Sequence, residues 1–316
     1  MNKKTTWLII VCFIATVLML SSCKSAVEEG VAPIQMDYSG SIEVGGLTRT
    51  YKIHLPTGYD GKKSFPLVLA FHLGYMQGRD MERLTHLSET ADKEGVIVVY
   101  PDGYKRCWAG PGLVNPAQIE GVDDVAFVSA LLDKMIDKLR VDQKRVYAVG
   151  ICNGGFLVQM LGCRLYDRLA AVAVAATAIN IEFIEWCQVK GRLPIMFFHG
   201  TEDTYILWEG GRGQSGRVTL MPVRTAVEKW AEINGCSSTP SISYMPDKAD
   251  DGTRVRREVY PGCQDGTEVV LYLVEGGGHT WPGGWQYIEE KTIGRTCRDI
   301  DASQLIWDFF EKHPKK

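Results

Sequence analysis

The stretch that most constrains this chain is Gly150-Ile151-Cys152-Asn153-Gly154-Gly155. It follows an apolar, β-branched run at 146–149 that predicts a buried strand, and it precedes a segment at 156–165 that predicts a helix. A strand that enters a helix through Gly-x-nucleophile-x-Gly is typical of a nucleophile elbow. The glycines are needed because so tight a turn leaves little room for neighbouring side chains. The pattern therefore predicts Cys152 as a nucleophile.

The alternative is a glycine-rich turn in which a small thiol packs between strand and helix, since free cysteines are often buried. The strand-turn-helix context favours the nucleophile, and so do the reactive residues that follow later strands.

Apolar runs of strand length alternate with amphipathic segments of helix length along the rest of the chain. This alternation predicts an α/β fold with a mostly parallel sheet, helices on both faces and an N-terminal antiparallel hairpin. We expect a single domain over 38–315. The expected strands are 42–44, 47–54, 65–71, 96–100, 146–149, 170–176, 195–198, 269–274 and a hairpin in 241–260, and the expected helices are 81–94, 123–139, 156–165, 223–233 and 302–312.

Reactive residues follow three of these strands, on loops at the carboxyl ends where sites form in such sheets. Cys152 comes first, Asp203 follows the strand at 195–198, and His279 follows the strand at 269–274. We expect Cys152 to attack an acyl carbon, His279 to transfer the proton and Asp203 to orient the imidazole. Glu202 stays open as an alternative to Asp203.

Two backbone amides should stabilise the oxyanion of such a reaction. The sequence predicts the amide of Asn153, together with that of Leu73 or Gly74 after the strand at 65–71. His72 and His199 directly end apolar strands, which predicts buried structural roles. The histidines and cysteines show no metal-ligand spacing, so we expect no metal.

The N-terminus predicts an export signal. Lys3 and Lys4 precede an apolar run at 7–20 and then Cys23, in the order of a lipoprotein signal peptide at 1–23, with Cys23 lipidated and a tether at 24–37. An ordinary signal peptide or a lone membrane anchor is the alternative. The prediction is a protein anchored by lipid at the bacterial cell envelope, periplasmic or on the surface.

Composition agrees with an exported globular protein. The net charge is -3 and 45% of residues are hydrophobic, so nothing suggests binding to nucleic acid. Nine cysteines are present, of which Cys12 and Cys23 lie in the signal. The odd number that remains predicts three disulfides and a free Cys152 in an oxidising compartment.

Besides the elbow, five further motifs stand in order along the chain: Tyr100-Pro101-Asp102-Gly103, Asp123-Asp124-Val125-Ala126-Phe127, His199-Gly200-Thr201-x-Asp203, Gly276-Gly277-Gly278-His279-Thr280-Trp281-Pro282-Gly283 and Arg298-Asp299-Ile300-Asp301-Ala302. Together these six motifs resemble one known family, the secreted polyhydroxybutyrate depolymerase/feruloyl esterase group of α/β-hydrolases. The resemblance implies the α/β-hydrolase fold, hydrolysis of carboxylic esters without a cofactor, and a triad at Cys152, Asp203 and His279.

The same resemblance bears on the cysteines. Members commonly pair the positions of Cys163 with Cys187 and of Cys236 with Cys263. Cys107 and Cys297 both depart from the family pattern, which predicts that they bridge two loops over the site. Cys152 departs as well, because the family nucleophile is serine, and Leu73 stands where the family usually has glycine.

Four tryptophans fall in or near the expected site loops: Trp108, Trp208, Trp281 and Trp285. They are candidates for stacking on an aromatic acyl group or a sugar ring, with packing at the rim as the alternative.

The expected function is an exported ester hydrolase acting on feruloyl or acetyl esters of plant polysaccharide, with polyester or short-chain esters next. One alternative is a catalytically impaired binding lipoprotein. Another is a lactone hydrolase of the dienelactone type, which the Gly-x-Cys-x-Gly-Gly pattern resembles.

Overall fold

The computed structural model describes residues 36–189, 191–212 and 218–316. The predicted signal peptide at 1–23, with Cys23, and the tether at 24–37 up to residue 35 lie outside the described residues. In the part of the chain that is described, no helix has the length and apolar character needed to cross a membrane.

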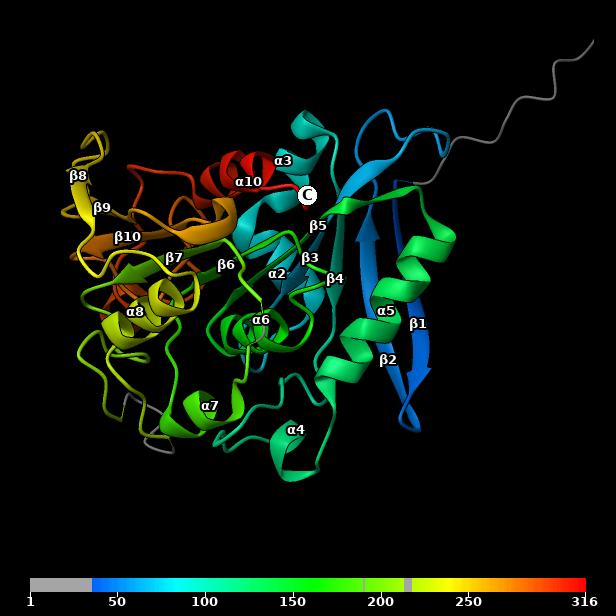
Figure 1. Ribbon diagram of the computed structural model, residues 1–316, viewed down its shortest axis with the longest axis horizontal. Coiled ribbons are helices and arrows are strands. Elements are labelled where there is room, and N and C mark those ends of the chain that lie inside the picture. Colours follow the sequence, from blue (N-terminus) through cyan, green and yellow to red (C-terminus); the bar gives the residue numbers. More distant parts are fainter. Residues whose placement is uncertain (1–35, 190, 213–217) are drawn as a thin grey trace, which may run out of the picture. The chain divides into compact units, whose positions relative to one another are not determined.

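One sheet runs through the described residues (Figure 1). Its ten strands are β1 (Asp37–Val44), β2 (Leu47–His54), β3 (Phe65–Phe71), β4 (Ile97–Pro101), β5 (Val141–Ile151), β6 (Ala171–Ala175), β7 (Ile195–Gly200), β8 (Ser241–Tyr244), β9 (Arg254–Tyr260) and β10 (Val269–Glu275). Their order is β1-β2-β4-β3-β5-β6-β7-β10-β9-β8.

The pairing confirms the mostly parallel sheet. Strands from β4 through β3, β5, β6 and β7 to β10 are parallel to their neighbours. At the two edges, β1 and β2 form the predicted antiparallel hairpin, and β9 and β8 also run antiparallel. The carboxyl ends of β5, β7 and β10 therefore meet at one edge of the sheet, where the three reactive loops begin.

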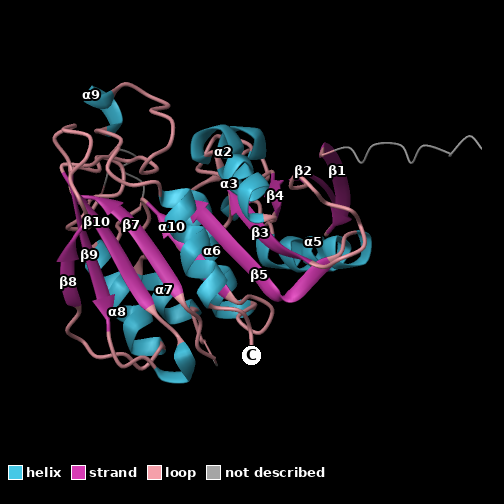
Figure 2. Ribbon diagram, turned by 90° about the horizontal axis from the view of Figure 1, so that it is seen from above, coloured by secondary structure: helices cyan, strands magenta, loops and turns pink. Residues whose placement is uncertain are grey.

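Helices cover both faces of the sheet, as predicted (Figure 2). Helices α5, α6 and α8 pack on one face, and α2, α3 and α10 pack on the other. The helices are α2 (Gly78–Thr85), α3 (Leu87–Glu94), α4 (Pro116–Ile119), α5 (Asp124–Lys138), α6 (Asn153–Arg164), α7 (Ile181–Trp186), α8 (Val223–Ile233), α9 (Glu290–Ile293) and α10 (Ala302–Lys312), with a short 3-10 helix, η1 (Gln264–Gly266).

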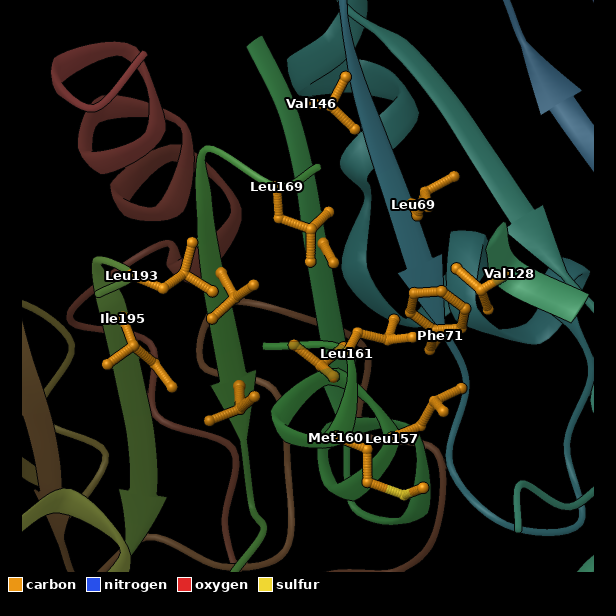
Figure 3. Close-up of a cluster of buried hydrophobic side chains, with 14 of the residues drawn as sticks. Leu69, Phe71, Val128, Val146, Leu157, Met160, Leu161, Leu169, Leu193 and Ile195 are labelled. Carbon is orange, nitrogen blue, oxygen red and sulfur yellow. The ribbon is translucent and has the colours of Figure 1, made fainter. Parts of the chain in front are cut away.

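Alternation along the central strands creates two cores. In β3, Leu67, Leu69 and Phe71 face the α5–α6–α8 side, whereas Val68 and Ala70 face the other. Figure 3 shows Leu157 and Leu161 of α6 in the same cluster as Phe71. Burying a side chain of this size contributes roughly 1.5–3 kcal/mol, so this packing fixes α6, and with it the turn that precedes the helix.

The helix expected over 81–94 is two helices. His86 adopts a left-handed conformation, with φ 56°, between α2 and α3. Its N–H still donates to the Glu82 carbonyl at 3.0 Å, so the residue ends one helix and begins the next. The apolar pattern spans both helices because Met81, Leu84 and Leu87 are buried in one core. Periodicity alone therefore could not reveal the break.

Two of the three expected disulfides are present, Cys163–Cys187 and Cys236–Cys263. The predicted bridge between Cys107 and Cys297 is wrong, because both are free, buried thiols. They belong to separate clusters. Cys107 packs with Ala109 and Ala117, whereas Cys297 lies in the core covered by α10.

Replacing Cys163 and Cys187 together by alanine should lower the free energy of unfolding by about 2–4 kcal/mol, measured by urea denaturation. The bridge closes a chain segment with a sequence separation of 24 residues, so its loss releases entropy in the unfolded state. The matched double variant, Cys107→Ala with Cys297→Ala, breaks no disulfide, so its free energy of unfolding should fall by less. An equal or larger fall in this variant would contradict the assignment of Cys163–Cys187 as a disulfide and of Cys107 and Cys297 as free thiols.

Candidate active site

The turn between β5 and α6 has the geometry of a nucleophile elbow. Cys152 adopts φ 54° and ψ -119°, and its N–H donates to the Ala175 carbonyl of the neighbouring strand at 2.9 Å. A β-carbon on Gly154 would lie 2.2 Å from the Phe71 carbonyl oxygen, and one on Gly150 would lie 2.5 Å from the backbone of Gly154. The structure thus requires both glycines and holds Cys152 in a strained backbone conformation.

Asp203 and His279 meet beside this turn from two other strands. Asp203 follows β7, His279 follows β10, and the His279 Nδ1 lies 2.7 Å from the Asp203 Oδ2. The other carboxylate oxygen accepts the amides of Tyr205 and Ile206, both at 2.8 Å. Because the carboxylate can only accept, Nδ1 carries the proton and Nε2 is left for another partner.

The charges of the pair are coupled. Burial alone would lower the pKa of His279, but the Asp203 carboxylate and the Cys152 sulfur outweigh it and raise the pKa well above the usual range. Burial alone would raise the pKa of Asp203, but His279 outweighs it and the net shift is downward. An imidazolium and a carboxylate are therefore favoured together at this position.

The other candidates at these loops have different surroundings. Glu202 is exposed, and the carboxylate bonded to His279 is that of Asp203. His199 is buried and its Nε2 bonds the Ile206 carbonyl at 2.8 Å. His72 is buried as well, between the Leu73 carbonyl and the Gly103 amide.

A cavity of about 720 Å³ opens over Cys152 and His279. The residues predicted to supply oxyanion amides, Asn153, Leu73 and Gly74, all line it. Among the described residues of its wall, none is Asp, Glu, Lys or Arg, so the cavity suits a neutral ligand with apolar groups. Its apolar and aromatic lining includes Tyr75, Met76, Leu113, Val114, Phe156, Tyr205, Ile206, Leu220, Tyr287, Ile288 and Ile293.

The four tryptophans do not line this cavity. Trp108 and Trp281 are fully buried, and their ring N–H groups donate to the His72 carbonyl and the Ser303 hydroxyl. Trp208 lies 6.0 Å from the His199 ring, and Trp285 lies under the Arg83 guanidinium at 3.7 Å. The predicted stacking role does not fit Trp108 and Trp281, because their rings are buried, whereas for Trp208 and the exposed Trp285 it stays a prediction.

Sequence reasoning missed the aromatic residues that do line the cavity. Tyr205 lies two residues after Asp203, and its ring is 5.2 Å from that of His279. The Tyr287 hydroxyl donates to the His279 carbonyl at 2.9 Å. Proximity to Asp203 was the one signal available for Tyr205, whereas Tyr287 lies in a loop with no motif around it.

One group of potential metal-ligating side chains lies outside this cavity. In the part of the chain that is described, only Asp37, His54 and Glu82 bring three potential ligands together. The Lys52 ammonium lies 2.6 Å from Glu82 and 3.2 Å from Asp37, so a cation of the protein already balances these carboxylates.

Known proteins share this sequence pattern and fold. The profile of the Esterase PHB depolymerase family matches residues 49–186. Feruloyl esterase B of Piromyces equi is 28% identical over 249 residues, which cover 76% of this chain and 45% of that protein. Feruloyl esterase D of Neurospora crassa is 26% identical over 282 residues, covering 85% of this chain and 83% of that protein.

The solved structure of an acetyl xylan esterase from Aspergillus awamori shares the fold. The TM-score is 0.58 at 14% identity, over 87% of this chain and 99% of that one. With the family profile and the feruloyl esterase relatives, this places the chain among esterases of the α/β-hydrolase fold. Residues 49–186 match the Esterase PHB depolymerase family, and together with the feruloyl esterase relatives this match identifies the chain as a carboxylic ester hydrolase.

Proposed function

We propose that the chain cleaves esters through a thioester acyl-enzyme on Cys152, with His279 as general base and acid and Asp203 as the residue that orients it. The observation that carries this proposal is the 2.7 Å bond between Asp203 and His279, in the same cavity as a cysteine held at φ 54°. The bond fixes the imidazole so that Nε2 remains for proton transfer with the thiol.

The reaction proceeds in two halves. The Cys152 thiol gives its proton to the His279 Nε2 as its sulfur forms a bond to the ester carbonyl carbon. The π electrons move to the carbonyl oxygen, which the amides of Asn153 and of Leu73 or Gly74 stabilise. When the oxyanion collapses, the carbon–oxygen bond to the alcohol breaks and His279 gives that oxygen a proton. Water, losing a proton to His279, then attacks the thioester carbon. The carbon–sulfur bond breaks, the acid is released, and His279 returns the proton to the Cys152 sulfur.

Feruloyl or acetyl esters of plant polysaccharide are the favoured substrates. The wall of the cavity carries no Asp, Glu, Lys or Arg side chain in its described part, and Tyr205 and Tyr287 offer aromatic faces to a hydroxycinnamoyl ring. Relatives named feruloyl esterase support this class, as does the fold shared with an acetyl xylan esterase. Polyesters and short-chain esters come second.

Export from the cell is consistent with an esterase that acts on polymeric substrates. The two disulfides suit an oxidising compartment, and the sequence at 1–23 has the order of a lipoprotein signal. We propose that Cys23 is lipidated and anchors the chain at the cell envelope, where polymeric substrates are met.

Purified protein should hydrolyse p-nitrophenyl acetate and methyl ferulate, and Cys152→Ala should lower kcat by about 10³-fold or more, since the nucleophile is lost. Asp203→Asn should lower kcat by about 10²–10⁴-fold while the Cys152 thiol remains. Release of p-nitrophenol and ferulate, followed by absorbance, measures both.

A different outcome would favour the binding-protein alternative. That result is an inert parent beside an active Cys152→Ser variant, because a serine would then restore chemistry that the cysteine lacks. Faster turnover of a lactone than of either ester would favour the dienelactone type.

The Asp203–His279 pair also predicts how stability depends on pH. The pKa of His279 is raised on folding, so its contribution is full below its unfolded pKa, near 6.5, and is lost as pH rises through the folded value. The pKa of Asp203 is lowered, so its contribution is lost as pH falls through that folded value. The pair therefore stabilises the fold between these two limits.

His279→Gln should accordingly destabilise the protein more at pH 5 than at a pH above the raised pKa of His279. Urea unfolding of parent and variant across this range measures the difference. In an Asp203→Asn background, the same substitution should show a much weaker dependence on pH, because the carboxylate that raises the pKa is gone. A pH-independent difference in the parent background would contradict the ion pair.

A further inference from the structure

One loop, residues 102–109, touches both segments that carry the proposed oxyanion amides. On the side of the nucleophile, the Trp108 N–H donates to the Asn153 Oδ1 at 2.7 Å, and the Asn153 Nδ2 donates back to the Trp108 carbonyl at 2.9 Å. The side chain of the residue after Cys152 is thus held on both of its polar atoms.

The same loop holds the second segment through His72. The Trp108 ring N–H donates to the His72 carbonyl at 2.9 Å, and the Gly103 N–H donates to the His72 Nε2 at 2.9 Å. The His72 Nδ1 therefore carries the proton and donates to the Leu73 carbonyl at 2.7 Å. Burial lowers the pKa of His72 to about 4, which keeps the ring neutral and this pattern intact near neutral pH.

A buried ion pair lies beneath the loop. The Arg49 Nη2 is 2.8 Å from the Asp124 Oδ1, and their side chains are 3% and 1% exposed. Arg49 also donates to the Asp102 carbonyl at 3.1 Å, and the Asp124 Oδ2 accepts the Ala109 N–H at 2.7 Å. The two charged side chains therefore form hydrogen bonds with the backbone at both ends of loop 102–109.

The surroundings of the pair favour a positioning role over a contribution to stability. The Arg49 guanidinium lies 3.9 Å from the centre of the Phe127 ring and 5.8 Å from that of Trp108. Removing two charges from water into such apolar surroundings is costly, and apolar residues can often replace a buried pair without loss of stability. An apolar pair, however, could not form the hydrogen bonds that hold the Asp102 carbonyl and the Ala109 amide in place.

We propose that the Arg49–Asp124 pair positions the oxyanion hole. It fixes the ends of loop 102–109, and that loop fixes Asn153 through Trp108 and the 72–74 segment through His72. The inference rests on the proposed function, because it concerns the amides that stabilise the ester oxyanion. Their effect depends on placement, since displacing such a group by about 1 Å can cost 10²-fold in rate.

Two reactions of Cys152 can distinguish a loss of oxyanion-hole positioning from general damage to the site. The burst of p-nitrophenol from p-nitrophenyl acetate reports acylation, which needs the oxyanion hole. Alkylation by iodoacetamide, followed by peptide mass analysis of Cys152, displaces iodide from a saturated carbon and forms no oxyanion. Asp124→Asn and Arg49→Lys should slow the burst by about tenfold to 10²-fold and change the alkylation rate by less than about threefold.

Asp123→Asn is the matched control. Asp123 is adjacent in sequence and caps the same helix by accepting the Ala126 N–H at 2.9 Å, but its side chain makes no bond to loop 102–109 in the described residues. Both rates should stay at the parental level in this variant.

Asn153→Ala tests the same connection with the ion pair intact. It keeps the backbone amide but removes both side-chain bonds to Trp108, so it should also slow the burst and spare alkylation. Combined with Asp124→Asn, it should slow the burst by less than the product of the single effects, because both changes break one chain of contacts.

The outcomes are distinguishable. If the parent releases no p-nitrophenol at all, the proposed function fails and this inference fails with it. If the parent reacts and both Asp124→Asn and Asn153→Ala match it, only the positioning role fails. Equal losses in acylation and alkylation, or single effects that multiply in the double variant, would also overturn it.

Discussion

Cys152 sits in a backbone conformation that most residues avoid, and the rest of the site depends on how the structure maintains it. The turn closes only because Gly150 and Gly154 carry no side chains and because Gly154 lies against the Phe71 carbonyl. The helix after the turn is then fixed by the packing of Leu157 and Leu161 on the sheet. A strained residue persists when its surroundings determine it this strongly.

The sheet converts positions far apart in sequence into one site. Because β5, β7 and β10 are parallel, their carboxyl ends meet at one edge, so Cys152, Asp203 and His279 come together although the last two are 76 residues apart. Around them, the hydrogen bonds of His72, Trp108 and Asn153 join the elbow to the neighbouring loop. Reactive groups and supporting contacts thus come from the same ends of the strands.

The sequence predicted most of the fold, and it predicted three residues that the structure brings to one edge of the sheet, because apolar runs, elbow glycines and residues that directly follow strands are local signals. It failed where three-dimensional neighbours decide. Trp108 was expected at the substrate and instead supports His72 from a buried position. Cys107 and Cys297 were paired because both departed from a family pattern, yet they lie in separate clusters. The buried Arg49–Asp124 pair joins residues 75 positions apart, and no local pattern indicates it.

The central claim is that the sulfur of Cys152 carries the acyl group during turnover. Its most direct test is to quench the protein with acid during hydrolysis of methyl ferulate and to map the modified peptide by mass spectrometry. The account predicts a feruloyl group on the peptide that contains Cys152, released by neutral hydroxylamine as a thioester would be. Turnover with the feruloyl group on a serine, or on no residue at all, would contradict it.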